Sequence, residues 1–502
     1  MATTELIESP ASTEPSTVVL PHPVRPRTVS HSELPAGLFR QTVEFLVVLT
    51  LGIVVFRTFE AEAYVVPTGS MAPALLGLHR ELDCSNCGYC LNLGVDDRGR
   101  SGRPICPNCG QGGLDDSTAP IRNGDRLLVH KYLYDLRPPR RWEVAVFQSP
   151  IEPSQAYVKR VMGLPGEMIQ IREGDLFVDG RMARKSLEQV RASRIPVYDN
   201  RYIPKDADRF PRWVFRRGRS RWATPSGWKA DGSAFVHQPV EGPRDLVDWL
   251  DYRHWDPELG RFGSVRDFYE YNGGDVRGEN VVKDLMLSAK VRVGPDAREL
   301  NVRMSRGGDT FFIRFQVDTA GGVQVQRNGR SLALDDLRGG MRSSPEARPR
   351  PQRLEVSVVD RRLIVALDGE PAFAPYDFEE EDRGPGVFAS PIGIGLNGGS
   401  AEVSELQLFR DIYYTSALFS TPRRPFAVDA PYLLGPDEYF VLGDNSPVSN
   451  DSRFWPDKPV VPAKAFVGKP FMVHLPGRMF EVRAFGRSLC WIPDPKEIRY
   501  IR

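Results

Sequence analysis

Two regions of similar, strand-like sequence are separated by a long stretch of different character, and this interruption limits the folds that the chain can adopt. Short runs of alternating apolar and polar residues, separated by turns, fill residues 120–185. The alternation stops near residue 190, and a pattern like that of 120–185 returns from Tyr432 onward. Runs of this kind are typical of β-strands. The sequence therefore predicts a mainly β protein in which one domain, 60–189 and 426–502, is split by an insertion.

The insertion has two parts of different character. From 284 to 415 alternation returns over many short strands, and the turns recur at the spacing of a two-sheet β-sandwich. Residues 190–283 are dense in Arg, Trp, Tyr and Pro and show no sustained period. We predict a sandwich for 284–415 and leave 190–283 without an assigned structure.

An apolar run lies near the N-terminus. Its uninterrupted core, Phe45 to Phe56, is shorter than the about 20 residues that cross hydrocarbon. Extension back to Leu38 brings in Arg40, Gln41 and Glu44, whose side chains must reach the interface. Basic residues before the run favour a cytoplasmic N-terminus. We interpret 38–59 as a transmembrane anchor behind a disordered tail, 1–37. A cleaved signal peptide and a buried core helix remain alternatives.

The charge of the chain is nearly balanced. It has 66 Lys and Arg against 65 Asp and Glu, which gives a formal net charge of +1. A protein that holds nucleic acid by bulk electrostatics needs a basic surplus. We therefore predict no nucleic-acid partner.

Two of the short segments contain a possible nucleophile and a possible base. "PTGSMAPAL" contains Ser70 and "YVKRVMGLPGE" contains Lys159. No histidine lies in a recognisable Ser-His-Asp pattern, so lysine is the candidate base. On an extended strand Lys159 and Arg160 face opposite sides, which predicts Lys159 inside and Arg160 in solvent. Burial lowers the pKa of a lysine, and a neutral amine can accept the proton of a serine.

A third segment, "GDNSPVSNDSR", is rich in polar side chains. Asp451 and Arg453 lie on one side of an extended chain and can pair, and Ser449 can hydrogen-bond to Lys159. Taken alone, each segment also fits an ordinary structure, such as an amphipathic strand lysine or a polar turn with a surface ion pair.

The three segments, in this order behind an apolar run, resemble bacterial type I signal peptidases. "NGDRLLVHK" (123–131) is similar to the family's strand between the serine and lysine segments. The resemblance implies Ser70 as nucleophile, Lys159 as general base, and the Ser70 backbone N–H with the Thr68 hydroxyl as oxyanion hole. It also implies that Ser449 orients Lys159. The residues implied to support the site are Asp444, Asn445, Asp451 and Arg453.

The same resemblance implies a signal-peptidase-type β catalytic domain, and it also implies the substrates and the cellular location of the protein. The expected substrates are exported preproteins with small residues at −1 and −3, and no cofactor is expected for catalysis. The expected location is the cytoplasmic membrane, with the lipid bilayer as partner and the catalytic domain outside the cytoplasm. The alternative is a non-catalytic, membrane-tethered binding protein on a peptidase scaffold.

A cysteine-rich loop, 79–118, interrupts the first half of the split domain. It contains two CxxC pairs, and four thiolates on two knuckles suit tetrahedral Zn²⁺. We predict a structural, zinc-ribbon-like insertion, although an exported protein can instead oxidise such thiols to disulfides. The predicted ligands are Cys84, Cys87, Cys106 and Cys109.

The sandwich resembles concanavalin-like or laminin-G-like domains of jelly-roll type. "LEVSVVDRRLIVALDG" and "PIGIGLNGGSAEVSELQLFRD" carry this likeness. Domains of this kind contact carbohydrate or protein, so both remain open as its partner.

Overall fold

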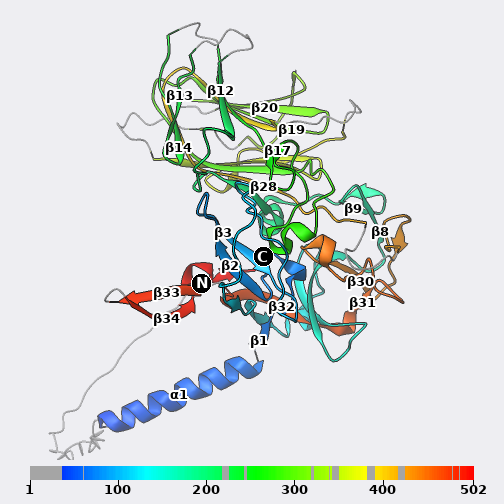
Figure 1. Ribbon diagram of the computed structural model, residues 1–502. Helices are drawn as coiled ribbons and strands as arrows, with labels where there is room; N and C mark the ends of the chain where they lie inside the picture. Colours follow the sequence, from blue (N-terminus) through cyan, green and yellow to red (C-terminus); the bar gives the residue numbers. More distant parts are fainter. Residues whose placement is uncertain are drawn as a thin grey trace, which may run out of the picture. The chain divides into compact units, whose positions relative to one another are not determined.

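The computed structural model of the chain is mainly β (Figure 1). The described residues are 37–59, 61–217, 225–241, 246–317, 322–337, 340–341, 350–380, 390–416, 424–477, 479–484 and 487–501. Apart from Gly37, the tail predicted over 1–37 lies outside the described residues.

The N-terminal apolar run forms one helix, α1 (Leu38–Phe59). Large apolar side chains along it are exposed, among them Phe45, Val48 and Leu51. Within the described part of the chain, no helix has the combination of length and apolar character that a membrane span requires. The anchor predicted over 38–59 therefore stays a prediction.

The split domain centres on an antiparallel sheet whose strands come from both sides of the insertion. In the sheet, the order among the described residues is β1, β5, β32, β6, β7, β30 and β31, with β35 paired to β32. Their bounds are Ala61–Val65 (β1), Arg126–His130 (β5), Val144–Gln148 (β6), Ala156–Gly163 (β7), Glu438–Leu442 (β30), Val461–Pro462 (β31), Phe466–Leu475 (β32) and Arg499–Tyr500 (β35). The insertion therefore separates strands that are neighbours in space.

Smaller sheets surround this one. A four-stranded sheet has the order β10, β9, β8 and β29, and strands β33 and β34 form a hairpin. The bounds are Met168–Arg172 (β8), Asp175–Val178 (β9), Arg181–Met182 (β10), Tyr432–Leu433 (β29), Met479–Ala484 (β33) and Arg487–Pro493 (β34). A helix with a capping box, α3 (Leu187–Ser193), follows β10. It leads the chain into the insertion.

Two sheets stack to form the sandwich. One follows the order β13, β14, β28, β18, β23, β24 and β25, with β11 on β28 and β26 on β24, and the other follows β12, β15, β27, β19, β20, β21 and β22. Side chains alternate between buried and half-buried along β20, as one inward face requires. The inner faces of both sheets contribute to a single apolar cluster, which contains Leu250, Leu287, Val302 and Ile394.

The sandwich begins before residue 284. Strands β11 to β15 come from the stretch to which the sequence assigned no structure, and they pair within the two sheets. The bounds of the strands are Ile195–Asp199 (β11), Trp213–Arg217 (β12), Trp228–Asp231 (β13), Ala234–His237 (β14), Asp248–Tyr252 (β15), Leu285–Val293 (β18), Glu299–Arg306 (β19), Asp309–Gln316 (β20), Val323–Arg327 (β21), Arg330–Ser331 (β22), Gln352–Val359 (β23), Arg362–Leu367 (β24), Glu370–Pro371 (β25), Tyr376–Asp377 (β26), Ile392–Asn397 (β27) and Ala401–Arg410 (β28).

Part of the stretch 190–283 lies outside the sandwich and packs on the cysteine-rich loop. Strands β2 (His79–Asp83) and β3 (Cys90–Gly94) of that loop form a small sheet with β4 (Ile121–Arg122), which follows the loop. The 3₁₀ segment η2 (Glu270–Asp275) contacts β3, and Gly274 N donates to Arg103 O at 2.8 Å. Two segments about 170 residues apart in sequence are thus docked on each other.

A buried ion cluster links the four-stranded sheet to the sandwich. Lys185 Nζ lies 3.1 Å from Asp360 Oδ1 and 2.8 Å from Asp411 Oδ2. Arg306 pairs with Asp284 and, at 3.3 Å, with Asp175 of β9. Buried charges of both signs are therefore matched across the joint.

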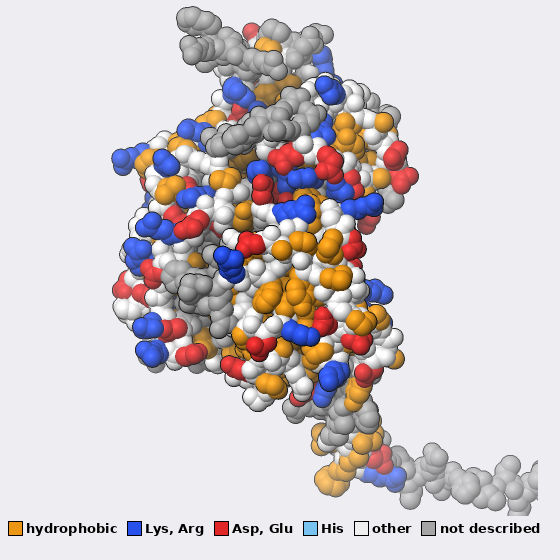
Figure 2. Space-filling model, turned by 90° about the vertical axis from the view of Figure 1, so that its right-hand side faces the viewer, with side chains coloured by type: hydrophobic (Ala, Val, Ile, Leu, Met, Phe, Trp, Pro, Cys, Tyr) orange, Lys and Arg blue, Asp and Glu red, His pale blue; other side chains and the backbone are white. Residues whose placement is uncertain are grey.

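Charged side chains are interspersed on the molecular face shown in Figure 2. Basic and acidic groups lie beside one another there, without one broad field of a single sign. This distribution agrees with the nearly balanced charge of the chain.

Candidate active site

Ser70 lies on a tight turn that follows β1. The turn is the 3₁₀ segment η1 (Gly69–Met71). Asn445 holds it from the third segment, because its backbone N–H donates to Ser70 O at 3.0 Å and its Nδ2 donates to Gly69 O at 3.0 Å. A Cβ at position 69 would lie 1.9 Å from Cε1 of Tyr271, so only glycine fits there. Packing on both sides therefore fixes the backbone next to Ser70.

Lys159 reaches Ser70 from β7. It pairs across the sheet with Ala145 of β6, and its Nζ lies 2.5 Å from Ser70 Oγ. The side chain is buried, with 4% of its surface exposed. The structure thus brings the nucleophile and base of the sequence hypothesis into hydrogen-bond contact.

Burial lowers the pKa of Lys159 from its ordinary value to about 8. The negative charges of Asp451 and Asp444 oppose this shift, and the positive charge of Arg453 adds to it. The amine therefore loses its proton close to neutral pH, which is the property that a general base needs.

Arg160 does not reach solvent, so that part of the strand prediction is wrong. Its side chain is 2% exposed and forms a two-point ion pair with Asp444, with distances of 2.8 Å (Nε to Oδ1) and 2.6 Å (Nη2 to Oδ2). It also donates to Trp142 O and to Ala192 O. The insertion covers the face of β7 that the sequence treated as open, since Ala192 belongs to α3.

Asp451 and Arg453 form a fully buried ion pair. Arg453 donates from Nε and Nη2 to the two carboxylate oxygens at 2.9 and 2.8 Å, and Gly443 N donates to Asp451 Oδ2 at 3.0 Å. The remaining guanidinium donors bind Thr415 O and the Oγ of Ser446. These bonds use the polar groups of the third segment and hold its loop against Ser70.

Ser449 is buried beside the nucleophile, but its Oγ has no hydrogen-bond partner among the described residues. The predicted bond from Ser449 to Lys159 is therefore not formed in this structure. A Cβ at Gly443 would lie 2.2 Å from this Oγ and 2.5 Å from Ser70 O, which shows how closely the two serines approach.

An open cleft of about 420 Å³ contains both members of the pair. Its walls are mostly apolar residues, some of them on β1, β5, β6 and β7, with Thr68 at the nucleophile turn. The lining residues are Tyr64, Val65, Val66, Pro67, Thr68, Gly69, Ser70, Val95, Asp96, Asp97, Leu127, Val146, Gln155, Ala156, Tyr157, Val158, Lys159, Tyr271, Val448 and Asn450. A chain in extended conformation fits a cleft of this size and character.

The sequence did not reveal three residues that surround the site. Tyr269, Tyr271 and Asn272 contact the nucleophile turn or the third segment, and all three come from the stretch without assigned structure. That stretch has no regular period, so the sequence carried no signal for their position.

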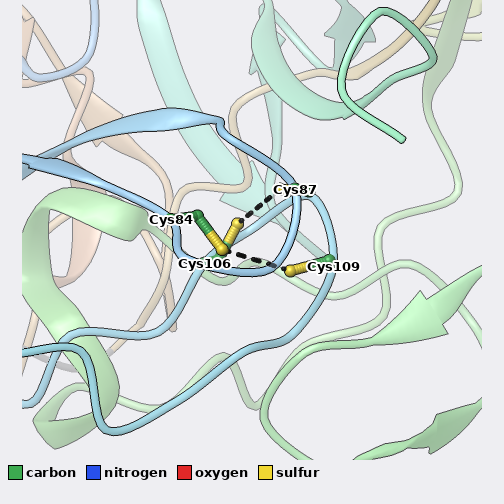
Figure 3. A group of neighbouring side chains, drawn as sticks. All are labelled: Cys84, Cys87, Cys106 and Cys109. Carbon is green, nitrogen blue, oxygen red and sulfur yellow. Dashed lines mark hydrogen bonds between the residues drawn. The ribbon is translucent and has the colours of Figure 1, made fainter. Parts of the chain in front are cut away.

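The four cysteines of the two CxxC pairs converge (Figure 3). Cys84 Sγ lies 3.5 Å from Cys109 Sγ, Cys87 Sγ lies 3.6 Å from Cys106 Sγ, and all four sulfurs lie within 4.8 Å of one another. All four are buried free thiols. Tetrahedral Zn²⁺ with bonds of about 2.3 Å requires sulfurs about 3.8 Å apart. The residues present fit that ion.

Part of this site lies in segments that are similar to a known family. The model of the family described as signal peptidase, peptidase S26, matches residues 115–214 and 357–475. These two segments of the chain are thus similar to the peptidase S26 family. The S26 match contains Lys159 and the third segment, and it begins after Ser70.

The chain is also similar to curated proteins. A protein named signal peptidase I from Leptolyngbya laminosa is 31% identical over 149 residues, which cover 28% of this chain and 49% of the relative. A probable signal peptidase I-2 from Synechocystis sp. is 27% identical over 165 residues, which cover 32% of this chain and 51% of the relative. The chain thus spans about half the length of these S26 relatives.

Among solved structures, the carbohydrate-binding module CBM66 from Bacillus subtilis aligns with 39% of this chain and 94% of the module. The identity is 8% and the TM-score is 0.24, which is too low to support an argument about ligand or function.

Proposed function

We propose that this protein is a serine endopeptidase that removes signal peptides from exported preproteins. The observation that carries the proposal is the 2.5 Å approach of Lys159 Nζ to Ser70 Oγ, with the lysine buried and its pKa lowered to about 8. A surface lysine at its ordinary pKa is charged at neutral pH and cannot accept a proton.

In the proposed reaction the neutral amine of Lys159 takes the proton of Ser70 as Oγ attacks the scissile carbonyl carbon. The backbone N–H of Ser70 and the hydroxyl of Thr68 stabilise the resulting oxyanion. The ammonium of Lys159 then gives its proton to the leaving amine, and an ester to Ser70 remains. Lys159 next takes a proton from water, and the hydroxide attacks the ester carbonyl carbon. The bond to Ser70 Oγ then breaks, the Lys159 ammonium returns its proton to Oγ, and the product leaves with a new carboxyl group.

Ser449 is the group proposed to hold Lys159 when Ser70 is acylated. Its Oγ is buried next to Ser70 and lacks a partner in the described part of the chain, so a hydrogen bond is available there. An unpaired buried hydroxyl costs about 1–3 kcal/mol, and a bond to the lysine would recover part of that cost.

The proposed substrates carry small residues at −1 and −3, and the enzyme is proposed to work at the cytoplasmic membrane. The mostly apolar lining of the cleft beside Ser70 supports the first point. The exposed apolar side chains of α1 support an anchoring role for that helix. Binding to vesicles by the full chain, and its loss when 38–59 is removed, would test the anchor.

We also propose that the four cysteines hold a structural Zn²⁺. Their number, burial and spacing fit a closed tetrahedral site that leaves no position for substrate. Metal analysis of the purified protein should find about one zinc per chain in the wild type and a loss of it in Cys106→Ser.

The experiment that tests the function is incubation of the purified protein with a preprotein, with the products identified by mass. We expect one cleavage, after a small residue, and none with Ser70→Ala. An equal rate of cleavage by Ser70→Ala, or no cleavage by the folded wild type, would contradict the proposal.

A further inference from the structure

The insertion reaches the active site through η2. This segment lies far from the peptidase segments in sequence, between β17 (Arg261–Phe262) and β18. It is nevertheless fixed on three sides, by the nucleophile turn, the third segment and the cysteine-rich loop. A segment held in this way is part of the site rather than a peripheral connection.

Tyr271 is the residue of η2 that enters the cleft. Its ring fits between Gly69 and Gly94, where a Cβ would lie 1.9 and 2.2 Å from the ring carbons. Its hydroxyl donates to Leu78 O at 2.6 Å, and only 7% of the residue is exposed. Because the hydrogen bond and two glycine backbones confine the ring, it forms a rigid wall.

The residues on either side of Tyr271 bind the third segment. Asn272 and Asn445 exchange two hydrogen bonds between their amides, of 2.8 and 2.7 Å, and Asn445 in turn binds Gly69 O. Tyr269 donates from its hydroxyl to Asp444 O at 2.8 Å. The position of the Tyr271 ring is therefore tied to the position of Ser70.

We propose that Tyr271 is a specificity-determining residue of this peptidase, and that the insertion thereby sets the size of the side chain accepted in the cleft. The inference rests on the proposed function. A substrate residue bound against the confined ring meets a surface that cannot move aside, so a larger side chain is rejected by overlap. Asn272 acts as a positioning residue through Asn445.

The test uses preproteins that differ at one position, −3, −1 or +1, where each carries Ala, Val or Leu. For the wild type we expect high kcat/KM only with Ala at the position next to Tyr271. Tyr271→Ala should raise the ratio of kcat/KM for Val over Ala there by about 10-fold or more, since one or two methylenes are worth that much in a pocket. Tyr271→Phe retains the ring and should keep the wild-type profile.

Two controls separate this inference from other causes. Tyr271→Leu provides a second cavity variant in case Tyr271→Ala does not fold, and thermal unfolding identifies a folding defect. Asp275→Asn removes the exposed ion pair of η2 with Arg103, outside the cleft, and should leave the profile unchanged.

The outcomes distinguish the two proposals. Cleavage of the Ala substrate by the wild type, together with the same profile in folded Tyr271→Ala and Tyr271→Leu, would overturn the role of Tyr271 and leave the proposed function standing. Failure of the folded wild type to cleave any preprotein would overturn the proposed function, and the inference with it.

Discussion

Two lysines of this molecule are equally buried and have opposite electrostatic surroundings. Lys159 in the cleft is 4% exposed and Lys185 at the joint with the sandwich is 3% exposed. Burial lowers the pKa of both, but the charges of Asp360 and Asp411 outweigh it at Lys185, whose pKa lies well above its ordinary value. At Lys159 burial prevails, and the pKa is about 8. Burial alone therefore does not produce a base.

The difference lies in how the nearby carboxylates are used. Asp444 and Asp451 are the acidic groups whose charges act on Lys159, and each is engaged in a two-point ion pair with an arginine. Arg160 and Arg453 thus neutralise the charges that would otherwise keep Lys159 protonated. At the joint, Asp360 and Asp411 contact Lys185 directly.

The largest expected effect concerns activity. Lys159→Met should reduce preprotein cleavage by at least about 10³-fold, because it removes the amine that lies in hydrogen-bond contact with Ser70 Oγ. Lys185→Met should retain cleavage in whatever fraction of the protein remains folded. Cleavage is measured per active site after separation of folded protein. Comparable activity of Lys159→Met and the wild type would contradict the claim that Lys159, unlike Lys185, acts as a base.

The next effect concerns stability at the joint. Lys185→Met leaves Asp360 and Asp411 buried without their common cation, and breaking a buried pair in this way costs about 3–5 kcal/mol in the free energy of unfolding. Urea unfolding at pH 7 measures the change. A cost below about 1 kcal/mol would mean that the joint is not held by this pairing.

A smaller change of opposite sign is expected in the cleft. Lys159→Met should raise the free energy of unfolding by about 3 kcal/mol below pH 8, because the wild type buries a charged amine there. The folded pKa lies below the unfolded one, so the wild type gains stability as the pH rises from about 8 towards 10.5, and the advantage of the variant disappears over that interval. Urea unfolding across this range checks it, and destabilisation by Lys159→Met at pH 7 would contradict it.

The sequence could predict the parts of the site that lie within short segments. Ser70, Lys159 and Asp451 each stand in a local pattern, and the predicted inward direction of Lys159 agrees with its burial on β7, whereas the outward direction predicted for Arg160 does not. The β-rich fold followed from the same local periodicity. These features depend on neighbours in sequence, which is why they can be read from it.

What the sequence could not predict depends on contacts between distant residues. The burial of Arg160 requires Asp444, and the wall at Gly69 requires Tyr271, each about 200 or more residues away. The strands of 195–252 join the two sheets of the sandwich by pairing with β27 and β28. No local period records such pairings, and without homologues of known structure they appear only in the fold.

The pH dependence of kcat/KM for preprotein cleavage tests the central claim most directly, since it reports the pKa of the essential base in the free enzyme. The account predicts a rate that rises with pH through one titration near pH 8 and is level above it, in the wild type and in Tyr271→Phe. A midpoint near the ordinary lysine value of 10.5, or a rate independent of pH from 6 to 9, would show that Lys159 is not the neutral amine that activates Ser70.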